Sequence, residues 1–231
     1  GTLYQGFRPI MWSVIEKTAL AEAEIEYMDK TSNSIYVSFP IVKSNHTALE
    51  GSSVVIWTTT PWSLPGNMAV AYNPEITYGL YETNKGKLII ALELFEAVSK
   101  ALDLEQSKLM ESFSGEILQG SHCHHPLFDL GYTHDVPLLP GDHVTTDSGT
   151  GLVHTAPGHG VEDFEVGKQF KLEVPLTVME DGVFHQSVPA FAGLHIYKAD
   201  EPIMEALTNA GKLLASSKIQ HSYPHSWRSK K

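Results

Sequence analysis

The side chains that could do chemistry begin with three consecutive hydroxyls, Thr58, Thr59 and Thr60, at the end of an apolar run. Pro61 biases the residue before it toward an extended backbone, which places these hydroxyls at the mouth of a strand. Asn67 follows a few residues later and offers an amide that could orient a ligand or the backbone. The stretch 57–67 can therefore present several hydrogen-bonding groups to one ligand.

A second polar stretch, 149–163, adds an imidazole and a carboxylate. Its Gly-Thr-Gly turn leads into a short strand with His154, and a Pro-Gly loop frees the backbone before Asp163, in the first turn of a predicted helix. Hydroxyls, one imidazole and one carboxylate suit a small, cationic, hydrogen-bonding ligand. The alternative is that both stretches are ordinary loops, because hydroxyl clusters at strand ends are common turn chemistry.

Common catalytic templates are missing from both stretches. The sequence has no Gly-x-Ser-x-Gly elbow, phosphate loop, dinucleotide fingerprint or His-Glu-x-x-His motif. Cys123 is far from both stretches in sequence, and no Ser or Thr has an evident base beside it, so no covalent intermediate is expected. His159 is near enough to suggest a general base, but nothing in the pattern requires one there. Trp57 and Trp62 are expected to pack beneath the strand end rather than to stack on a base.

Composition limits the partners. The 231 residues are 42% hydrophobic, enough for one sizeable core, and no apolar run of about 18 residues predicts a membrane span. The net charge of −11 argues against a surface that wraps duplex phosphates. Any phosphate contact is expected in the less acidic segment 212–231, unless that segment is only a solvated tail. The single cysteine excludes an internal disulfide and fits a reducing cytosol. The N-terminus lacks Met and a signal pattern, which suggests a cut from a longer polypeptide.

Four segments, taken in order, resemble the editing insertion of bacterial isoleucyl-tRNA synthetase, a class I aminoacyl-tRNA synthetase. They are Thr-Ala-Leu-Ala-Glu-Ala-Glu at 18–24, the stretches 57–67 and 149–163, and His-Ser-Tyr-Pro-His at 221–225. The resemblance covers essentially the whole chain. The first and last segments favour the isoleucyl enzyme over the valyl and leucyl enzymes, which share the other two themes.

The resemblance implies a reaction and a role for each residue. The family's editing site hydrolyses the ester of valine misattached to isoleucine tRNA, excludes the larger isoleucyl ester, and is also reported to accept valyl-adenylate. Asp163 would hold the α-ammonium through a charge-assisted hydrogen bond, unless it is only a first-turn carboxylate favoured by the helix dipole. His154 would stand against the amino-acid side chain, unless it is a structural histidine. Thr58, Thr59 and Thr60 would line the pocket and position the ester and a water, and Asn67 completes the substrate-binding set.

The resemblance also implies partners and cofactors. The partners are the acceptor end of isoleucine tRNA, its misattached valine and the rest of the synthetase, in the cytoplasm and without a membrane. The His-Ile-Gly-His and Lys-Met-Ser-Lys-Ser motifs are absent from these residues. No cofactor is therefore expected here, because ATP and Mg belong to the parent's aminoacylation site. Two alternatives stay open: an acceptor-end binding module that is silent without the rest of the enzyme, and a metal hydrolase built on 122–125.

Metal sites are not expected. The adjacent residues His122-Cys123-His124-His125 lack the separated pairs that tetrahedral sites use, and with Pro126 they predict a solvated loop. Many relatives carry two Cys-x-x-Cys zinc pairs. The corresponding positions of this chain do not support a structural zinc, since they hold Ser13, Glu16, Ser226 and Ser229.

Hydrophobic periodicity predicts many short strands and a few helices. The predicted strands are 34–42, 52–58, 68–72, 143–146 and 218–223, with hairpins at 76–91 and 174–184, the first turning at Gly86. Residues 1–11 and 11–27 are expected to be extended, and the predicted helices are 92–102, 162–170 and 199–210. This pattern predicts a mainly β fold with peripheral helices (α+β), a closed β-barrel. The resemblance implies the β-barrel editing fold of the valyl, leucyl and isoleucyl enzymes, a single domain over 1–231. Its connecting segments are 1–30 and 215–231, and its core is 31–214.

Overall fold

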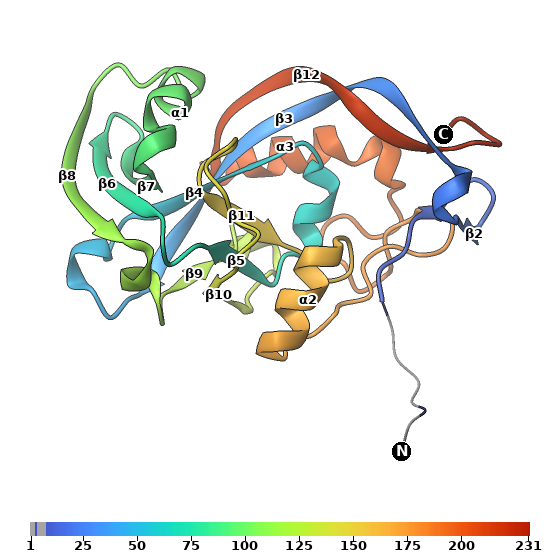
Figure 1. The fold of residues 1–231 in the computed structure, drawn as a ribbon, viewed down its shortest axis with the longest axis horizontal. Coiled ribbons are helices and arrows are strands. Elements are labelled where there is room, and N and C mark those ends of the chain that lie inside the picture. The colour runs from blue at the N-terminus through green and yellow to red at the C-terminus, as the bar shows by residue number, and fades with distance from the viewer. Residues whose placement is uncertain (1–2, 4–7) are drawn as a thin grey trace.

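The part of the chain that the structure describes forms one mixed ten-stranded sheet, a small two-stranded sheet and three short α-helices (Figure 1). The computed structural model describes residue 3 and residues 8–231, so part of the expected extended segment 1–11 lies outside the described residues. The strands are β1 Trp12–Ser13, β2 Thr18–Ala19, β3 Ile25–Lys43, β4 Ser53–Thr58, β5 Ala69–Tyr72, β6 Thr77–Thr83, β7 Gly86–Ala91, β8 Ser107–Ser114, β9 His122–His124, β10 Asp135–Pro140, β11 Leu152–Thr155 and β12 Leu213–Ser226.

The longest feature is the antiparallel ribbon of β3 and β12, which crosses the molecule in Figure 1. Its ladder runs from Leu213 opposite Val37 to Ser226 opposite Ile25. The segments expected to connect the domain to a longer chain, 1–30 and 215–231, thus pair with each other. Both strands exceed the predicted 34–42 and 218–223, because backbone hydrogen bonds continue the ladder where the apolar alternation stops.

The mainly β class with peripheral helices is confirmed, but the strands do not close into a barrel. The hydrogen-bonded order is β11-β5-β10-β9-β3-β4-β7-β6-β8, with β12 on β3. β11 lies close to β4, yet no ladder joins them in the described part of the chain. The sheet is therefore open between β4 and β11, the two strands that lead into the polar stretches 57–67 and 149–163.

The predicted hairpin and helices form close to their expected bounds. β6 and β7 turn at Gly86, whose φ of +98° is open to glycine. The helices are α1 Phe95–Ala101, α2 Val161–Phe170 and α3 Asp200–Asn209, and a 3-10 helix, η3, spans Pro61–Gly66. The second expected hairpin is reduced to an isolated bridge between Val178 and Phe184.

The predicted strand 143–146 is wrong. Val144 donates its N–H to the carbonyl of Gly141 in a turn, and its own carbonyl accepts from the amide of Asn73. The strand lies earlier, as β10, which pairs in parallel with β5 and antiparallel with β9. β10 tolerates Pro137 and Pro140 because Leu138 and its neighbours still supply ladder groups.

The hydrophobic core includes buried side chains from β3, β4 and β7. Val37, Phe39, Val54 and Ile56 alternate across the ladder of β3 and β4 and are fully buried. This packing fixes the end of β4, and with it the first threonine of the hydroxyl run.

Candidate functional site

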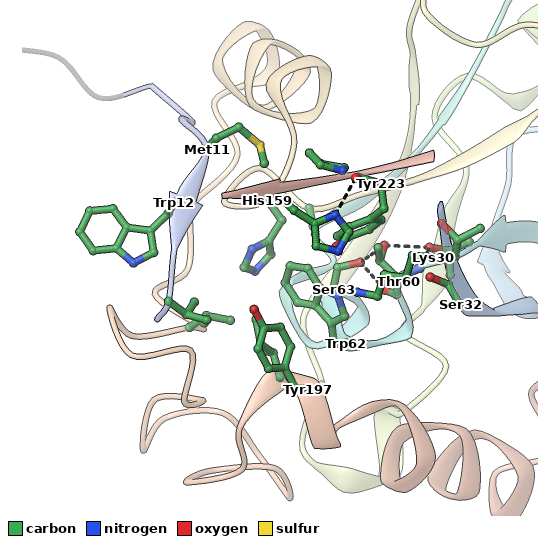
Figure 2. A pocket seen from close by; sticks show the side chains of 18 of the residues that line it. Met11, Trp12, Lys30, Ser32, Thr60, Trp62, Ser63, His159, Tyr197 and Tyr223 are labelled. Atoms are coloured by element: carbon green, nitrogen blue, oxygen red, sulfur yellow. Dashed lines mark hydrogen bonds between the residues drawn. The ribbon is translucent and has the colours of Figure 1, made fainter. Parts of the chain in front are cut away.

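The two polar stretches meet at one cleft of about 1280 Å³. β4 delivers the threonines at its carboxyl end, and β11 runs close beside it and delivers His154. Part of the β3–β12 ribbon lines the cleft next to the threonines, and β1 and Tyr197 line other parts of it (Figure 2). The predicted residues that line the cleft are Thr58, Thr59, Thr60, His154 and Asp163.

The threonine hydroxyls form a short hydrogen-bonded chain. Thr58 Oγ1 accepts from the backbone N–H of Thr60 at 3.1 Å, and the two side-chain oxygens lie 3.2 Å apart. Thr60 Oγ1 in turn lies 3.3 Å from Ser63 Oγ, in η3. Thr58 is buried, whereas Thr59 and Thr60 are partly exposed. The two more exposed threonines are therefore the ones best placed to meet a ligand.

His154 is held at both ring nitrogens. Its Nε2 lies 2.9 Å from Ser63 Oγ, and its Nδ1 lies 3.0 Å from Asn67 Nδ2. Asn67 Nδ2 also donates to the carbonyl of Ala69 at 2.8 Å, which fixes the orientation of the amide because a carbonyl cannot donate. Nδ1 of His154 therefore accepts, and Nε2 carries the proton and donates to Ser63.

This tautomer decides what His154 can do. Burial lowers the pKa of His154 to about 3, so the imidazole is neutral at pH 7. Since its Nε2–H donates to Ser63 Oγ, the ring cannot remove the Ser63 proton, which goes to the carbonyl of Thr60 at 2.8 Å. The pair is not a nucleophile and base. His154 instead presents a fixed, uncharged wall to the cleft.

Ser63 lines the cleft beside His154, whereas Asn67 acts on the cleft only through His154. Asn67 was predicted to bind substrate, but its side chain is fully buried, does not line the cleft and contacts His154 from behind. Ser63 was not singled out in the sequence, because a lone serine followed by leucine and proline carries no signal of its own. Only the fold brings its hydroxyl to His154.

Asp163 lies in the first turn of α2 and lines the cleft. One of its oxygens, Oδ2, accepts the backbone N–H of Ala156 at 2.8 Å, which ties α2 to the end of β11. A Cβ at Gly160 would lie only 2.9 Å from Asp163 Cγ, so a glycine is required there. Burial raises the pKa of Asp163 to about 6, the hydrogen bond from Ala156 opposes that rise, and neighbouring Glu162 adds to it. The carboxylate is ionised at pH 7 but poorly solvated, which favours a cationic ligand.

The aromatic residues Trp57 and Trp62 are partly buried and line the cleft. Trp57 donates its indole N–H to Ser34 at 2.6 Å, and Trp62 meets His159 edge to face at 5.1 Å. His159 Nε2 lies 2.6 Å from Thr177 Oγ1, and burial lowers its pKa to about 4. Its Nε2 is thus engaged and its low pKa makes it a weak proton acceptor, so His159 is a poor general base.

The whole chain aligns with curated isoleucine–tRNA ligases. It is 47% identical to that of Gluconobacter oxydans, 46% to that of Bradyrhizobium diazoefficiens and 49% to that of Bacillus cereus, in each case over 100% of the chain. The chain is homologous to a segment of the isoleucine–tRNA ligases. This confirms the family expected from the four sequence segments. The chain spans only about a quarter of the length of these ligases.

The fold comparison agrees. The crystal structure of GlLeuRS-CP1 matches with a TM-score of 0.62 over 80% of this chain and 98% of that one, at 13% sequence identity. The chain therefore shares its fold with that structure. A scan against protein-family models found no match. Among the described residues, no helix has the length and apolar character needed to cross a membrane.

The histidine cluster of this ligase segment differs from the solvated loop that was predicted. His122–His124 form β9, and Cys123 and His125 are buried. The rings take separate partners: His122 faces Asp135 at 3.1 Å, His124 stacks on a phenylalanine, and His125 Nε2 bonds the carbonyl of Leu64 at 3.0 Å. The strand pairing explains the error, because burial comes from β3 and β10 on either side. No group of three or more His, Cys, Asp or Glu in the described residues is arranged to hold a metal.

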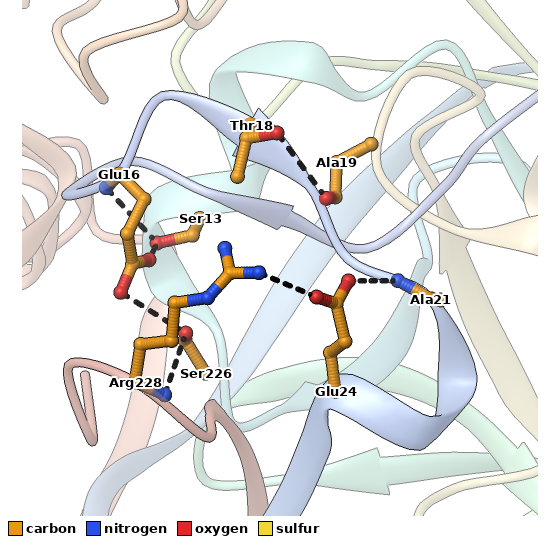
Figure 3. A network of polar contacts seen from close by, with 8 residues as sticks. All are labelled: Ser13, Glu16, Thr18, Ala19, Ala21, Glu24, Ser226 and Arg228. Carbon is orange, nitrogen blue, oxygen red and sulfur yellow. Dashed lines mark hydrogen bonds and ion pairs between the residues drawn. The ribbon is translucent and has the colours of Figure 1, made fainter.

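Three of the positions expected to carry zinc cysteines in relatives, Ser13, Glu16 and Ser226, lie together at the end of the ribbon (Figure 3). Glu16 contacts the hydroxyl of Ser13 and accepts from Ser226 Oγ at 3.1 Å. Ser13 and Ser226 are buried. A carboxylate and hydroxyls therefore join the two segments at this point. The absence of a structural zinc remains a prediction.

Proposed function

We propose that this segment hydrolyses the aminoacyl ester of tRNA mischarged with valine, Val-tRNA(Ile), with valyl-adenylate as a further candidate substrate. The observation that carries the proposal is the pairing, in one cleft, of an ionised half-buried carboxylate with a neutral imidazole. Asp163 would bind the α-ammonium of the amino acid, and His154 would face its side chain. The positions of both side chains in the cleft support this arrangement.

An editing site is needed in addition to the site that selects the amino acid, because binding energy alone discriminates poorly between isoleucine and valine. A hydrophobic pocket gains only about 1–3 kcal/mol from one methylene, and isoleucine against valine is the standard case of that limit. An editing cleft works in the opposite direction, since it must admit the smaller side chain and exclude the larger one. His154 suits this task because Ser63 and Asn67 hold its ring at both ends. A fixed wall excludes by size, whereas a mobile one would adapt.

The chemical step proposed is direct attack of water on the ester carbonyl. The hydroxyls of Thr59 and Thr60 would position the ester and the water. Thr58 would hold the hydroxyl of Thr60 from the buried side of the hydrogen-bonded row. The tautomer of His154 and the buried Cys123 leave no activated nucleophile in the described part of the cleft. Rate enhancement would then come from positioning and electrostatics. The acceptor end of the tRNA, the rest of the ligase and a cytoplasmic location complete the proposal.

The test is deacylation of Val-tRNA(Ile) and Ile-tRNA(Ile) by the purified chain. Wild type is expected to release valine and spare isoleucine, and Asp163→Asn is expected to lose valine release. Glu162→Gln is the matched control, because Glu162 is the neighbouring carboxylate on α2 but is exposed and does not line the cleft. Release of neither amino acid by a folded chain would contradict the proposal and favour an acceptor-end binding module.

A further inference from the structure

His159 lies at the point where the polar stretches 57–67 and 149–163 touch. Its ring meets Trp62 edge to face, with the ring centroids 5.1 Å apart, and both side chains line the cleft (Figure 2). Its Nε2 lies 2.6 Å from Oγ1 of Thr177, a buried residue in the segment that follows α2. One side chain therefore joins three segments that are separated in sequence.

Gly66, at the end of η3, leaves the space that the His159 ring occupies. A Cβ at this position would lie 2.9 Å from Cδ2 and 3.1 Å from Nε2 of His159. Carbon atoms in van der Waals contact lie about 3.5–4.0 Å apart, so an alanine would have to displace the ring. Gly66 does not have a positive φ, so its backbone does not itself require a glycine. The close approach of the two stretches at His159 is therefore the reason for the glycine.

The turn that contains His159 also holds Asp163. The backbone N–H of His159 donates to the carbonyl of Ala156 at 2.8 Å, and the N–H of Ala156 donates to Asp163 Oδ2, also at 2.8 Å. Because Ala156 bonds both residues, the turn 156–163 carries the carboxylate and the ring as one unit. A shift of the ring relative to η3 therefore shifts Asp163 relative to the threonines.

The threonine side of the cleft is attached to η3. Thr60 Oγ1 lies 3.3 Å from Ser63 Oγ, and the same serine contacts His154 on β11. His154 thus joins η3 to the strand, and His159 joins η3 to the turn that follows the strand. Burial lowers the pKa of His159 to about 4, so the ring is neutral at pH 7 and acts there by its shape rather than by charge.

We propose that His159 is a positioning residue, whose ring sets the separation between the carboxylate of Asp163 and the threonine row. The inference rests on the proposed function, because it assumes that Asp163 holds the α-ammonium while the threonines hold the ester. A ligand that is held at both ends needs the two contacts at the correct separation. An error of about 1 Å in such a separation can lower a rate about a hundredfold.

The test measures how strongly the cleft prefers a free amine. The probes are valine joined to adenosine through an amide in place of the ester, and the same compound with its α-amine acetylated, each titrated calorimetrically into the chain. Wild type is expected to bind the free amine about tenfold more tightly. His159→Ala and Gly66→Ala should each lose most of this preference, because both displace the turn of Asp163. A preference is a ratio of two affinities, so a partly unfolded sample leaves it unchanged.

The contact between Gly66 and the ring is tested by thermal unfolding, followed by circular dichroism. Gly66→Ala should lower the melting temperature of the wild-type chain, because its methyl group displaces the His159 ring. In the His159→Ala background the same methyl group has no ring to displace, so the melting temperature should not fall further. Equal falls in both backgrounds would overturn the inference, since the glycine would then be required for another reason.

Gly141→Ala is the matched control for the binding measurement. A Cβ there would lie 2.7 Å from the ring of His143, but neither residue lines the cleft, so this variant should keep the wild-type preference. Thr177→Val removes the hydroxyl beside Nε2 and should weaken the preference, whereas Thr177→Ser retains the hydroxyl and should keep it. The inference is overturned if wild type shows no preference, if His159→Ala keeps it, or if Gly141→Ala loses it to the same extent.

Hydrolysis separates this inference from the proposed function. If wild type prefers the free amine through His159 but releases no valine from Val-tRNA(Ile), the positioning role stands and the proposed hydrolysis fails. If wild type releases valine, and His159→Ala does so with the same kcat/KM and the same amine preference, the proposed hydrolysis stands and the positioning role fails.

Discussion

The pH dependence of ester hydrolysis follows from the environment of Asp163. Burial raises its pKa to about 6, so about one eleventh of the carboxyl is ionised at pH 5 and about ten elevenths at pH 7. If only the ionised form binds the α-ammonium, kcat/KM should rise about tenfold across this range. His154 and His159, with pKa values of about 3 and 4, stay neutral throughout and add no titration of their own.

The assay is the initial rate of deacylation of Val-tRNA(Ile) at low substrate concentration between pH 5 and pH 8, with spontaneous hydrolysis subtracted. Glu162→Gln provides an internal check, because the charge of Glu162 helps to raise the pKa of Asp163. Its removal should move the rise in rate to lower pH by a fraction of a unit. A wild-type rate that is flat from pH 5 to pH 7, as an ordinary aspartate would give, would refute the reasoning.

Four further outcomes follow from the same contacts. Ser63→Ala should lower kcat less than about tenfold, because Ser63 accepts from His154; a loss above about a thousandfold would indicate a nucleophile. Asn67→Ala should lower the free energy of unfolding by about 2 kcal/mol in urea, since it leaves His154 Nδ1 without its donor; a change below about 0.5 kcal/mol would contradict this. Burial lowers the pKa of His125 and His154 to about 3, so these histidines bind protons at higher pH in the unfolded chain than in the folded one. The free energy of unfolding should therefore fall as pH drops below 6.5 toward 3. A free energy of unfolding that stays constant over this range would contradict the two lowered pKa values. The pKa of Asp163 is raised rather than lowered, so its ionisation destabilises the folded chain, with the full cost present above pH 6. Asp163→Asn should therefore raise the free energy of unfolding at pH 7 by on the order of 1–3 kcal/mol. A lower melting temperature for this variant would contradict the prediction.

Much of the scaffold could be predicted from short-range sequence patterns. The hairpin at Gly86, the strand that ends in Thr58 and the helix that carries Asp163 all depend on neighbours in sequence, such as a glycine with positive φ or an apolar alternation. Five of the six predicted site residues accordingly line one cleft. Asn67 is the exception, and its burial behind His154 could not be read from its position after a turn.

The remaining features depend on contacts between distant segments. Lys30 and Tyr223 lie in polar stretches that carry no apolar alternation, yet pairing of the two strands extends the ladder through both. Pairing with β3 and β10 likewise buries the histidine cluster at 122–125, which looked solvated in isolation. The sheet stays open between β4 and β11 for the same kind of reason, since closure depends on ladder geometry rather than on strand count.

In the proposed reaction, Asp163 recognises the α-ammonium of an aminoacyl ester. The most direct measurement compares cleavage of valyl-tRNA and N-acetylvalyl-tRNA by wild type and Asp163→Asn, because acetylation removes the ammonium without changing the side chain. Wild type should prefer the free amine, and the variant should lose that preference, so that the two losses are far from additive. Equal cleavage of both esters by wild type, or the same preference in the variant, would contradict the account.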